Sequence, residues 1–408
     1  MQSAVAEPAA RVVEPADNAG EPSAPTQVAP IDIAPDAPAP RAMAGEDRVP
    51  DTPAHYLAGL FLLALLLIGS IVIGNRLLTP WLHMPVYVED IGKTLLDGQN
   101  YAVFDLNVDI RGIRRAQFAG MPKAPEVMVL GASHWQEASA DLLPGHEVFN
   151  AHVHRDYYDD IVAAVGLLIV NDKLPQRLVI SIRDSTFTSP QNRTDYLWLP
   201  FIPDYRAAEE LFGIEPRSLL DDIHPRQVWN FFSLPALVDT SKRWIRADAI
   251  PGPTDQVELP RLDVLQSDGS IRWSREHLAE FTPERSRRLA LEMARSVQNR
   301  KPELNPRAIA AVETVLKDLQ ERQVEVLLVH PPFNPLFYAA ITGTTYEQGL
   351  HDVASLTREM AGKYGFRVAG SFDPKPIGCT SDMYIDAEHG NPNCMRLVLA
   401  SIASRFKD

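Results

Sequence analysis

The feature of this sequence that most constrains the fold is an apolar run over residues 56–74, which contains no charge and no proline. As a helix rising ~1.5 Å per residue, these 19 residues would be about 28 Å long, close to the hydrocarbon thickness of a bilayer. Tyr56 and Trp81 lie where interfacial aromatic side chains are common, and Arg76 ends the run on one side. The pattern therefore predicts a transmembrane helix over residues 56–77.

Two other interpretations of this run fit less well. A buried core helix usually carries several polar side chains over five turns. This run has only Ser70. A cleaved signal peptide would begin near the N-terminus and end at a small-x-small site, and the run does neither. Arg41 and Arg48 precede the helix and only Arg76 follows it closely, so the positive-inside count favours a cytoplasmic tail and an exported body by one charge.

The segment before the helix has a different composition. Residues 1–53 are rich in Pro and Ala, carry more acidic than basic residues, and contain no Phe, Trp or Tyr. Such a segment cannot bury enough apolar surface to offset its chain entropy. We predict a disordered tail here, with a docking site for a partner as the alternative.

From residue 79 onward the pattern is that of a folded α/β domain. Apolar runs rich in β-branched residues predict strands at 127–131, 147–151, 177–182, 324–330 and 366–370. Helical patterns cover 157–173, 206–212, 227–245, 283–299, 306–321, 346–364 and 392–405. Because strands alternate with helices, we expect parallel βαβ units in a single sheet. Residues 185–280 break the alternation and predict an insertion with some helices and a long loop over 249–275.

Charge and cysteine content exclude several classes of function. The net charge is −14, from 39 Lys+Arg against 53 Asp+Glu, and no basic patch is visible for binding nucleic acid. The two cysteines are too few for a Cys-based zinc module. His152 and His154 would share a face on a strand, but no third ligand is evident, so we predict no metal and no cofactor.

The first candidate catalytic residue follows the first predicted core strand. Residues 127–134 read VMVLGASH, so Ser133 comes two residues after Gly131 at the end of a buried strand. In a parallel α/β sheet, active sites collect at this carboxyl edge. Gly-x-Ser after a strand is also a common helix N-cap, so the motif by itself is weak. The strand at 324–330 leads to the same edge, where His330 and Asn334 either line a cleft or form a rigid turn.

The second candidate group lies near the C-terminus. Asp386 precedes His389 by three residues, and Gly390 follows at once. On one loop, such an Asp can orient the imidazole and stabilise its cation, and the His can then take a proton from a serine hydroxyl. An ordinary surface turn has the same Asp-x-x-His pattern. Cys379 and Cys394 bracket this segment, and a disulfide between them would close a loop of about 15 residues, worth roughly 3 kcal/mol; two unrelated buried thiols are the alternative.

Together, a serine after the first core strand and an Asp-x-x-His before the last helix resemble the layout of the SGNH hydrolase superfamily. The likeness covers residues 120–185 and 305–408. It is closest to the membrane-anchored branch that includes the D-alanyl-lipoteichoic acid transfer and alginate O-acetylation proteins. This resemblance implies a flavodoxin-like SGNH domain in which Ser133 is the nucleophile, His389 the general base and Asp386 its orienting acid.

The sequence departs from the family at the oxyanion hole. Members usually supply a Gly from a second block and an Asn from a third, which here would be residues 149–155 and 180–184. The Gly position falls near Arg155, and the third block contains no Asn. Candidate substitutes are Arg155, Arg183, Asn150 and a backbone N–H, although Arg183 could instead form a salt bridge with Asp184 or another acid. His134 would contact the leaving group or form a wall of the site.

The resemblance implies a single-pass protein of the bacterial inner membrane with an extracytoplasmic catalytic domain. Its expected activity is O-acyl transfer, with acetyl as the leading candidate group, to a cell-envelope or exported polysaccharide, with a multi-pass acyltransferase as partner. An esterase would use the same three residues. The alternative is a non-catalytic scaffold or glycan-binding subunit, which the missing oxyanion residues favour. A general lipase or thioesterase is disfavoured because the Gly-x-Ser-x-Gly elbow is absent.

Overall fold

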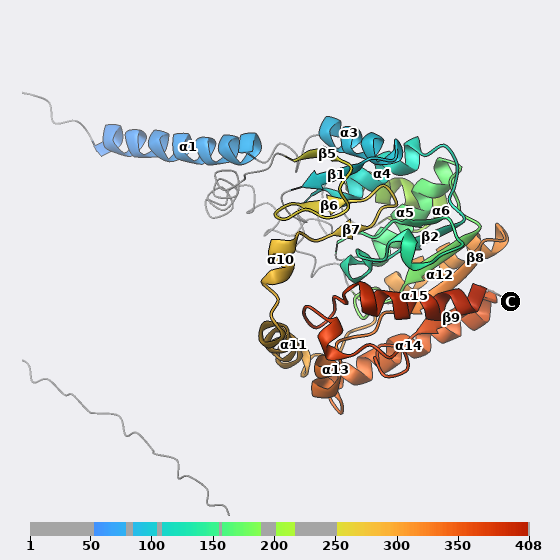
Figure 1. The fold of residues 1–408 in the computed structure, drawn as a ribbon. Helices are drawn as coiled ribbons and strands as arrows, with labels where there is room; N and C mark the ends of the chain where they lie inside the picture. Colours follow the sequence, from blue (N-terminus) through green and yellow to red (C-terminus); the bar gives the residue numbers. More distant parts are fainter. Residues whose placement is uncertain are drawn as a thin grey trace, which may run out of the picture. The chain divides into compact units, whose positions relative to one another are not determined.

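The computed structural model describes residues 53–78, 85–103, 108–154, 157–188, 201–216 and 251–406 (Figure 1). Several predictions lie outside these residues: the tail before Pro53, the interfacial position of Trp81, the role of Arg155, the helix over 227–245, and much of the insertion over 185–280.

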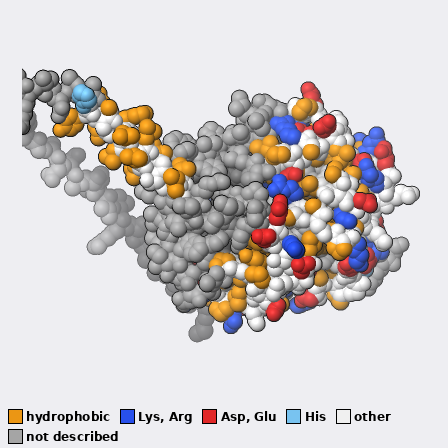
Figure 2. Space-filling view, turned by 90° about the horizontal axis from the view of Figure 1, so that it is seen from above, with side chains coloured by type: hydrophobic (Ala, Val, Ile, Leu, Met, Phe, Trp, Pro, Cys, Tyr) orange, Lys and Arg blue, Asp and Glu red, His pale blue; other side chains and the backbone are white. Residues whose placement is uncertain are grey.

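The predicted membrane segment is a helix. Helix α1 spans Pro53–Leu78, and its window His55–Ile73 has a mean hydropathy of 2.7 with none of it buried. Figure 2 shows hydrophobic side chains along the surface of this helix. Leu and Phe side chains exposed in this way have no protein core to enter, and a helix of this length fits a single membrane crossing. Among the described residues, α1 is the one helix that is long and apolar enough to cross a membrane.

A parallel five-stranded sheet forms the centre of the body, as the sequence predicted. Its strands are β2 (Val127–Leu130), β3 (Val148–Asn150), β4 (Arg177–Ser181), β8 (Glu325–His330) and β9 (Arg367–Gly370). They lie in the order β3-β2-β4-β8-β9, and every pair is parallel. Counted along this sheet, the order is 2-1-3-4-5, which is that of flavodoxin-like sheets.

The sheet is covered on both faces, which explains its nearly continuous apolar strands. Met128 and Leu130 of β2 belong to one large core, whereas Val127 and Val129 belong to another. This alternation follows from the two-residue period of a strand. The first core contains residues of α5 (Tyr158–Val170), α12 (Pro306–Glu321) and α14 (Thr345–Tyr364). The second contains residues of α15 (Pro392–Phe406).

Helix starts and stops follow the capping chemistry in the sequence. Asn305 caps α12 through the Arg307 N–H, and Thr344 caps α14 through the Glu347 N–H. Gly365 ends α14 in the left-handed conformation at φ 72°. The Glu347 carboxylate accepts a hydrogen bond from the Gly343 N–H at 2.6 Å, one residue before the cap.

Six further α-helices follow from the described residues. They are α3 (Pro85–Leu96), α4 (Ile110–Gly120), α6 (Ile202–Phe212), α10 (Arg275–Ala279), α11 (Pro283–Val297) and α13 (Pro335–Ile341). Helix α11 begins at the Thr282 cap predicted from its Thr-Pro pair.

A second, antiparallel sheet corrects one prediction. It consists of β5 (Gly252–Thr254), β1 (Asn100–Val103), β6 (Asp263–Leu265) and β7 (Ile271–Arg272), in that order. The long loop predicted over 249–275 is therefore wrong, because three short strands lie within it. Each has only two or three residues, which is too few to show a periodicity. They form a sheet because β1, which precedes the main sheet in the sequence, pairs with both β5 and β6.

Candidate active site

The turn after β2 positions Ser133 at the carboxyl edge of the parallel sheet. After Gly131 and Ala132, a short 3₁₀ helix covers Ser133–Trp135. The Trp135 side chain is fully buried against this turn. A Cβ atom on Gly131 would lie 2.6 Å from Trp135 Cδ1 and 2.8 Å from Ser181 Cβ, so only glycine fits here. The backbone therefore turns tightly between the strand and the half-buried serine.

The loop that carries His389 meets this turn. The Ser133 Oγ lies 2.8 Å from His389 Nε2, and His389 Nδ1 lies 2.7 Å from Asp386 Oδ2. Ser133 and His389 are 256 residues apart in the sequence. The three residues that the sequence proposed as a catalytic set thus form one continuous hydrogen-bonded chain.

Asp386 has a double role in this geometry. Its Oδ1 accepts the backbone N–H groups of Glu388 and His389, each at 2.8 Å, while its Oδ2 faces the imidazole. Burial by itself would raise the pKa of Asp386, but His389 and the two N–H groups lower it to about 2. Burial would likewise lower the pKa of His389, but the nearby Asp386 carboxylate raises it above its usual value. Asp386 therefore stays ionised and holds the imidazole with Nδ1 as the donor.

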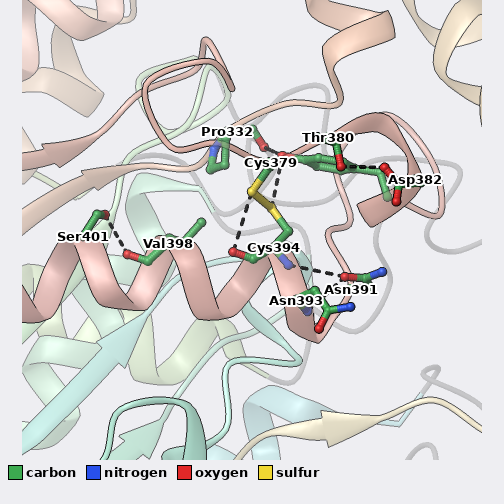
Figure 3. Close-up of a disulfide and its surroundings, with 10 residues drawn as sticks. Pro332, Cys379, Thr380, Asp382, Asn391, Asn393, Cys394, Val398 and Ser401 are labelled. Carbon is green, nitrogen blue, oxygen red and sulfur yellow. Dashed lines mark hydrogen bonds between the residues drawn. A yellow bond between two sulfur atoms is a disulfide. The ribbon is translucent and has the colours of Figure 1, made fainter.

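A disulfide joins the two ends of the segment that contains this loop. Cys379 and Cys394 are bonded, which is the pairing considered from the sequence (Figure 3). Both cysteines are buried, and Cys394 lies in the first turn of α15. Within the segment, Tyr384 and Gly390 form an antiparallel bridge, and the Tyr384 hydroxyl donates to the Pro332 carbonyl at 3.1 Å. The loop is therefore attached to α15 and to the turn after β8.

Asn334 supports the same loop from the turn after β8. Its side-chain amide donates to the Asp386 carbonyl at 2.8 Å, and its backbone N–H donates to the Ala387 carbonyl at 2.9 Å. Its Oδ1 accepts the Leu336 N–H at 2.9 Å and caps α13. Asn334 is only 1% exposed, so it positions the loop and does not line a cleft.

Arg183, proposed as an anion contact, is paired with an acid. Its Nη2 donates to Glu388 Oε2 at 2.7 Å and lies 3.8 Å from Asp184 Oδ1. The salt-bridge alternative considered from the sequence is therefore the arrangement observed. The Arg183 guanidinium lies next to the His389 loop through Glu388.

Two other candidates for substrate contact point elsewhere. Asn150 is 1% exposed, and its amide is committed to the Trp135 and Ala138 carbonyls and to the His152 N–H. Its expected contact with substrate is thus corrected: Asn150 braces the turn that carries Ser133 from inside. His134 is buried, its Nε2 lies 2.9 Å from Ser181 Oγ, and burial holds its pKa well below the usual value. It is a neutral wall residue.

The backbone at Ser133 leaves a donor available. At the start of the 3₁₀ helix, the Ser133 N–H has no hydrogen-bond acceptor among the described residues. The first N–H groups of a helical turn have no partner within that turn, and they can bind an oxyanion.

Two residues beside the site were missed by the sequence analysis. The Trp273 ring, directly after β7, lies 5.8 Å from the His389 ring. Glu137, on the Ser133 loop, is buried, its pKa is raised by this burial to about 7, and Arg272 lies 3.7 Å away. Trp273 falls in the segment expected to be a loop, and Glu137 carries no motif, so only the chain fold brings them here.

No family model matches this sequence, and comparison with curated proteins finds no significant match. The resemblance to SGNH hydrolases therefore stays a prediction from the sequence.

Proposed function

We propose that this chain is a membrane-anchored serine acyl-ester enzyme of the SGNH type, which transfers an O-acyl group, acetyl in the first instance, to a cell-envelope or exported polysaccharide. The observation that supports this is the chain of hydrogen bonds from Ser133 Oγ through His389 to Asp386, at 2.8 and 2.7 Å. A hydroxyl, a base and an orienting acid in this order are what acyl transfer requires.

The proposed reaction has two halves. In the first, Ser133 Oγ attacks the carbonyl carbon of an acyl ester while His389 Nε2 takes the hydroxyl proton. The tetrahedral intermediate then collapses, the bond to the leaving oxygen breaks, and His389 gives the proton to that oxygen. In the second half, His389 removes a proton from a sugar hydroxyl, which attacks the acyl-enzyme and releases Ser133. Water in place of the sugar would give hydrolysis, and the acyl donor would be supplied by a multi-pass acyltransferase partner in the membrane.

The oxyanion of both halves would be held first by the Ser133 N–H. Arg183 and Asn150 are committed to other partners, and each missing donor costs about 3–4 kcal/mol of transition-state stabilisation. We therefore expect a slower reaction than that of an enzyme with a complete oxyanion hole. The same observation favours the second candidate function, a non-catalytic scaffold or glycan-binding subunit of an envelope polysaccharide-modification complex.

A serine-reactive fluorophosphonate separates these two functions. With the full-length protein in detergent, we expect covalent labelling that Ser133→Ala abolishes. Ser381→Ala is the matched control, because Ser381 lies in the disulfide-closed segment and, in the part of the chain that the structure describes, has no hydrogen bond to His389. This variant should label like the unchanged protein. A folded protein that does not label would reject the enzyme and support the scaffold.

Transfer and hydrolysis are separated by the fate of the acyl group. After reaction with p-nitrophenyl acetate, an acyltransferase should move acetyl to added polysaccharide fragments in preference to water. Release of acetate at an unchanged rate, with no acetylated glycan detected by mass spectrometry, would identify an esterase.

The location of the body is tested independently. One apolar helix fits a single membrane crossing, and the charge count favours a cytoplasmic tail and an extracytoplasmic catalytic domain. Protease added to intact spheroplasts should then digest the body and spare the tail. The reverse pattern would invert the topology and remove the argument for an envelope glycan as acceptor.

A further inference from the structure

The site contains an ion pair for which the proposed reaction has no direct use. Arg183 follows the end of β4, and Glu388 immediately precedes His389. Their side chains are 12% and 14% exposed, and the distance from Arg183 Nη2 to Glu388 Oε2 is 2.7 Å. Removing one partner of a largely buried pair leaves a charge without compensation, which is costly. A pair in this position needs an explanation beyond surface solubility.

We propose that Arg183 and Glu388 are a positioning pair for His389, which fixes the turn that holds the imidazole against Ser133. This inference rests on the proposed function, since it assigns the pair a part in the same site. Neither side chain is proposed to touch substrate.

Hydrogen bonds connect Glu388 to both sides of the turn that holds His389. Its backbone N–H donates to Asp386 Oδ1, next to the bond from the His389 N–H to the same oxygen. Its side chain is bound to Arg183 at the other end. Glu388 thus connects the carboxylate that orients His389 with a residue outside the loop, so the turn is held from both sides.

The partner residue is itself anchored to the sheet and to a helix. The Arg183 N–H donates to Thr186 Oγ1 at 2.9 Å, in the turn that follows β4. In the same turn, Asp184 Oδ2 accepts a hydrogen bond at 2.7 Å from the hydroxyl of Tyr346, in the first turn of α14. The His389 loop is therefore connected through one ion pair to the central sheet and to the helix that packs on it.

The two charges act on His389 in opposite directions. Glu388 raises the pKa of His389 and Arg183 lowers it, after the larger effects of burial and of Asp386. The other groups that face the imidazole are Ser133, the neutral His134 and Glu137 from the nucleophile turn, and Trp273 and His277 from the segment after β7. None of these changes in the variants below, so a shift in the titration of His389 reports on the pair.

The test uses charge-removing variants of similar shape in the full-length protein in detergent. The rate of fluorophosphonate labelling is measured from pH 5 to pH 9 for Glu388→Gln, Arg183→Gln and the double variant. Glu388→Gln should move the acid limb of the profile to lower pH and Arg183→Gln should move it to higher pH. The double variant should return close to the original position, and Arg183→Lys, which keeps the charge, should stay there. Glu313→Gln is the matched control, because it removes the acid of an exposed pair with Lys363.

A role confined to stability predicts a different result. Both variants would then lower the melting temperature and leave the profile where it was, or move it the same way, and either outcome would overturn the proposal. Glu388→Ala tests the geometric part, because a catalytic base displaced by 1 Å can cost about 10²-fold in rate. A labelling rate unchanged in Glu388→Ala would also overturn it.

A titration that does not depend on reactivity separates this proposal from the proposed function. Histidine-selective ¹⁵N NMR, with His389 assigned through His389→Gln, measures the imidazole directly. Opposite shifts of the His389 titration in an unreactive protein would support the pair while rejecting the enzyme. Normal labelling with no shift in either variant would support the enzyme while rejecting the pair.

Discussion

The two halves of the candidate site are held in place by different forces. The turn that carries Ser133 is held mainly by close packing, because Gly131 lies against Trp135 and Ser181, and Trp135 is fully buried. The buried Asn150 amide adds two hydrogen bonds to it. The His389 loop buries Tyr384 and Ala387 in the two large cores, and covalent and polar links add to this packing. A disulfide, the amide of Asn334 and an ion pair hold it there.

This difference separates two physical demands of the proposed reaction. The serine needs only to be placed at the sheet edge, which close packing and one internal amide achieve. A general base must also have the correct tautomer and orientation, which only directional bonds such as those of Asp386 supply. We expect substitutions in the first half to act through overpacking, and those in the second to act through lost orientation.

The largest expected effect is on orientation. Asp386→Asn should slow fluorophosphonate labelling of Ser133 by about 10⁴-fold, because an amide at this position no longer holds His389 in the tautomer that accepts a proton. The fold should persist, since the carbonyl oxygen of the new amide can still accept the two backbone N–H groups of the turn. Labelling rates and circular dichroism, measured on the same samples, check both statements. A rate within tenfold of the unchanged protein would remove Asp386 from the catalytic set.

The disulfide is the next largest contribution. Cys379→Ser with Cys394→Ser should lower the free energy of unfolding by roughly 3 kcal/mol, because the bond closes a loop whose ends are 15 residues apart. Urea unfolding followed by tryptophan fluorescence measures this. The pH profile of labelling should keep its position while the rate falls, since the ionisable groups remain. An unchanged stability would mean that Asn334 and the ion pair hold the loop unaided.

A methyl group on Gly131 tests the packed half. Gly131→Ala should cost about 1–3 kcal/mol, because its Cβ would lie 2.6 Å from Trp135 Cδ1 and 2.8 Å from Ser181 Cβ. Chemical unfolding measures the loss, and labelling of Ser133 should slow as the turn moves. Gly362→Ala is the control, since no heavy atom lies within 4 Å of the position of its added Cβ. Equal effects at both glycines would contradict the packing argument.

The smallest expected effect is the change in labelling rate for each unit of pH. His389 must be neutral to take the serine proton, and its pKa is raised above the usual value of 6.5. Labelling should therefore fall on the acid side of a pKa above 6.5, by about tenfold (~1.4 kcal/mol) for each further pH unit. Asp386, with a pKa of about 2, stays ionised throughout this range. A rate that is flat down to pH 5 would mean that His389 is not the base.

Much of the framework could be predicted from local patterns. Apolar runs mark β2, β4 and β8 of the parallel sheet. The caps at Thr282, Asn305 and Thr344 mark where α11, α12 and α14 begin. The antiparallel sheet could not be predicted in this way. Its strands contain as few as two residues, and their pairing with β1 depends on parts of the chain about 150 residues apart.

The candidate site also has residues that the sequence could predict and residues that it could not. Ser133, Asp386 and His389 carry spacing signals that are readable before any fold is known. The partners of Arg183 and Asn150 carry no such signal, because a sequence does not show which acceptor a guanidinium or an amide will bind. Trp273 comes to lie beside His389 only through the position of β7 in the second sheet.

By itself, the sequence determined the apolar helix, the alternation of strands and helices, and the three residue types that a serine acyl transfer needs. These follow from composition and periodicity, which are local properties of the chain. Only the tertiary structure decided that Ser133 and His389 meet, that Glu388 takes Arg183 as its partner, and that the two cysteines are joined. Such contacts depend on packing and hydrogen-bond geometry between segments far apart in the chain, and no local pattern encodes them.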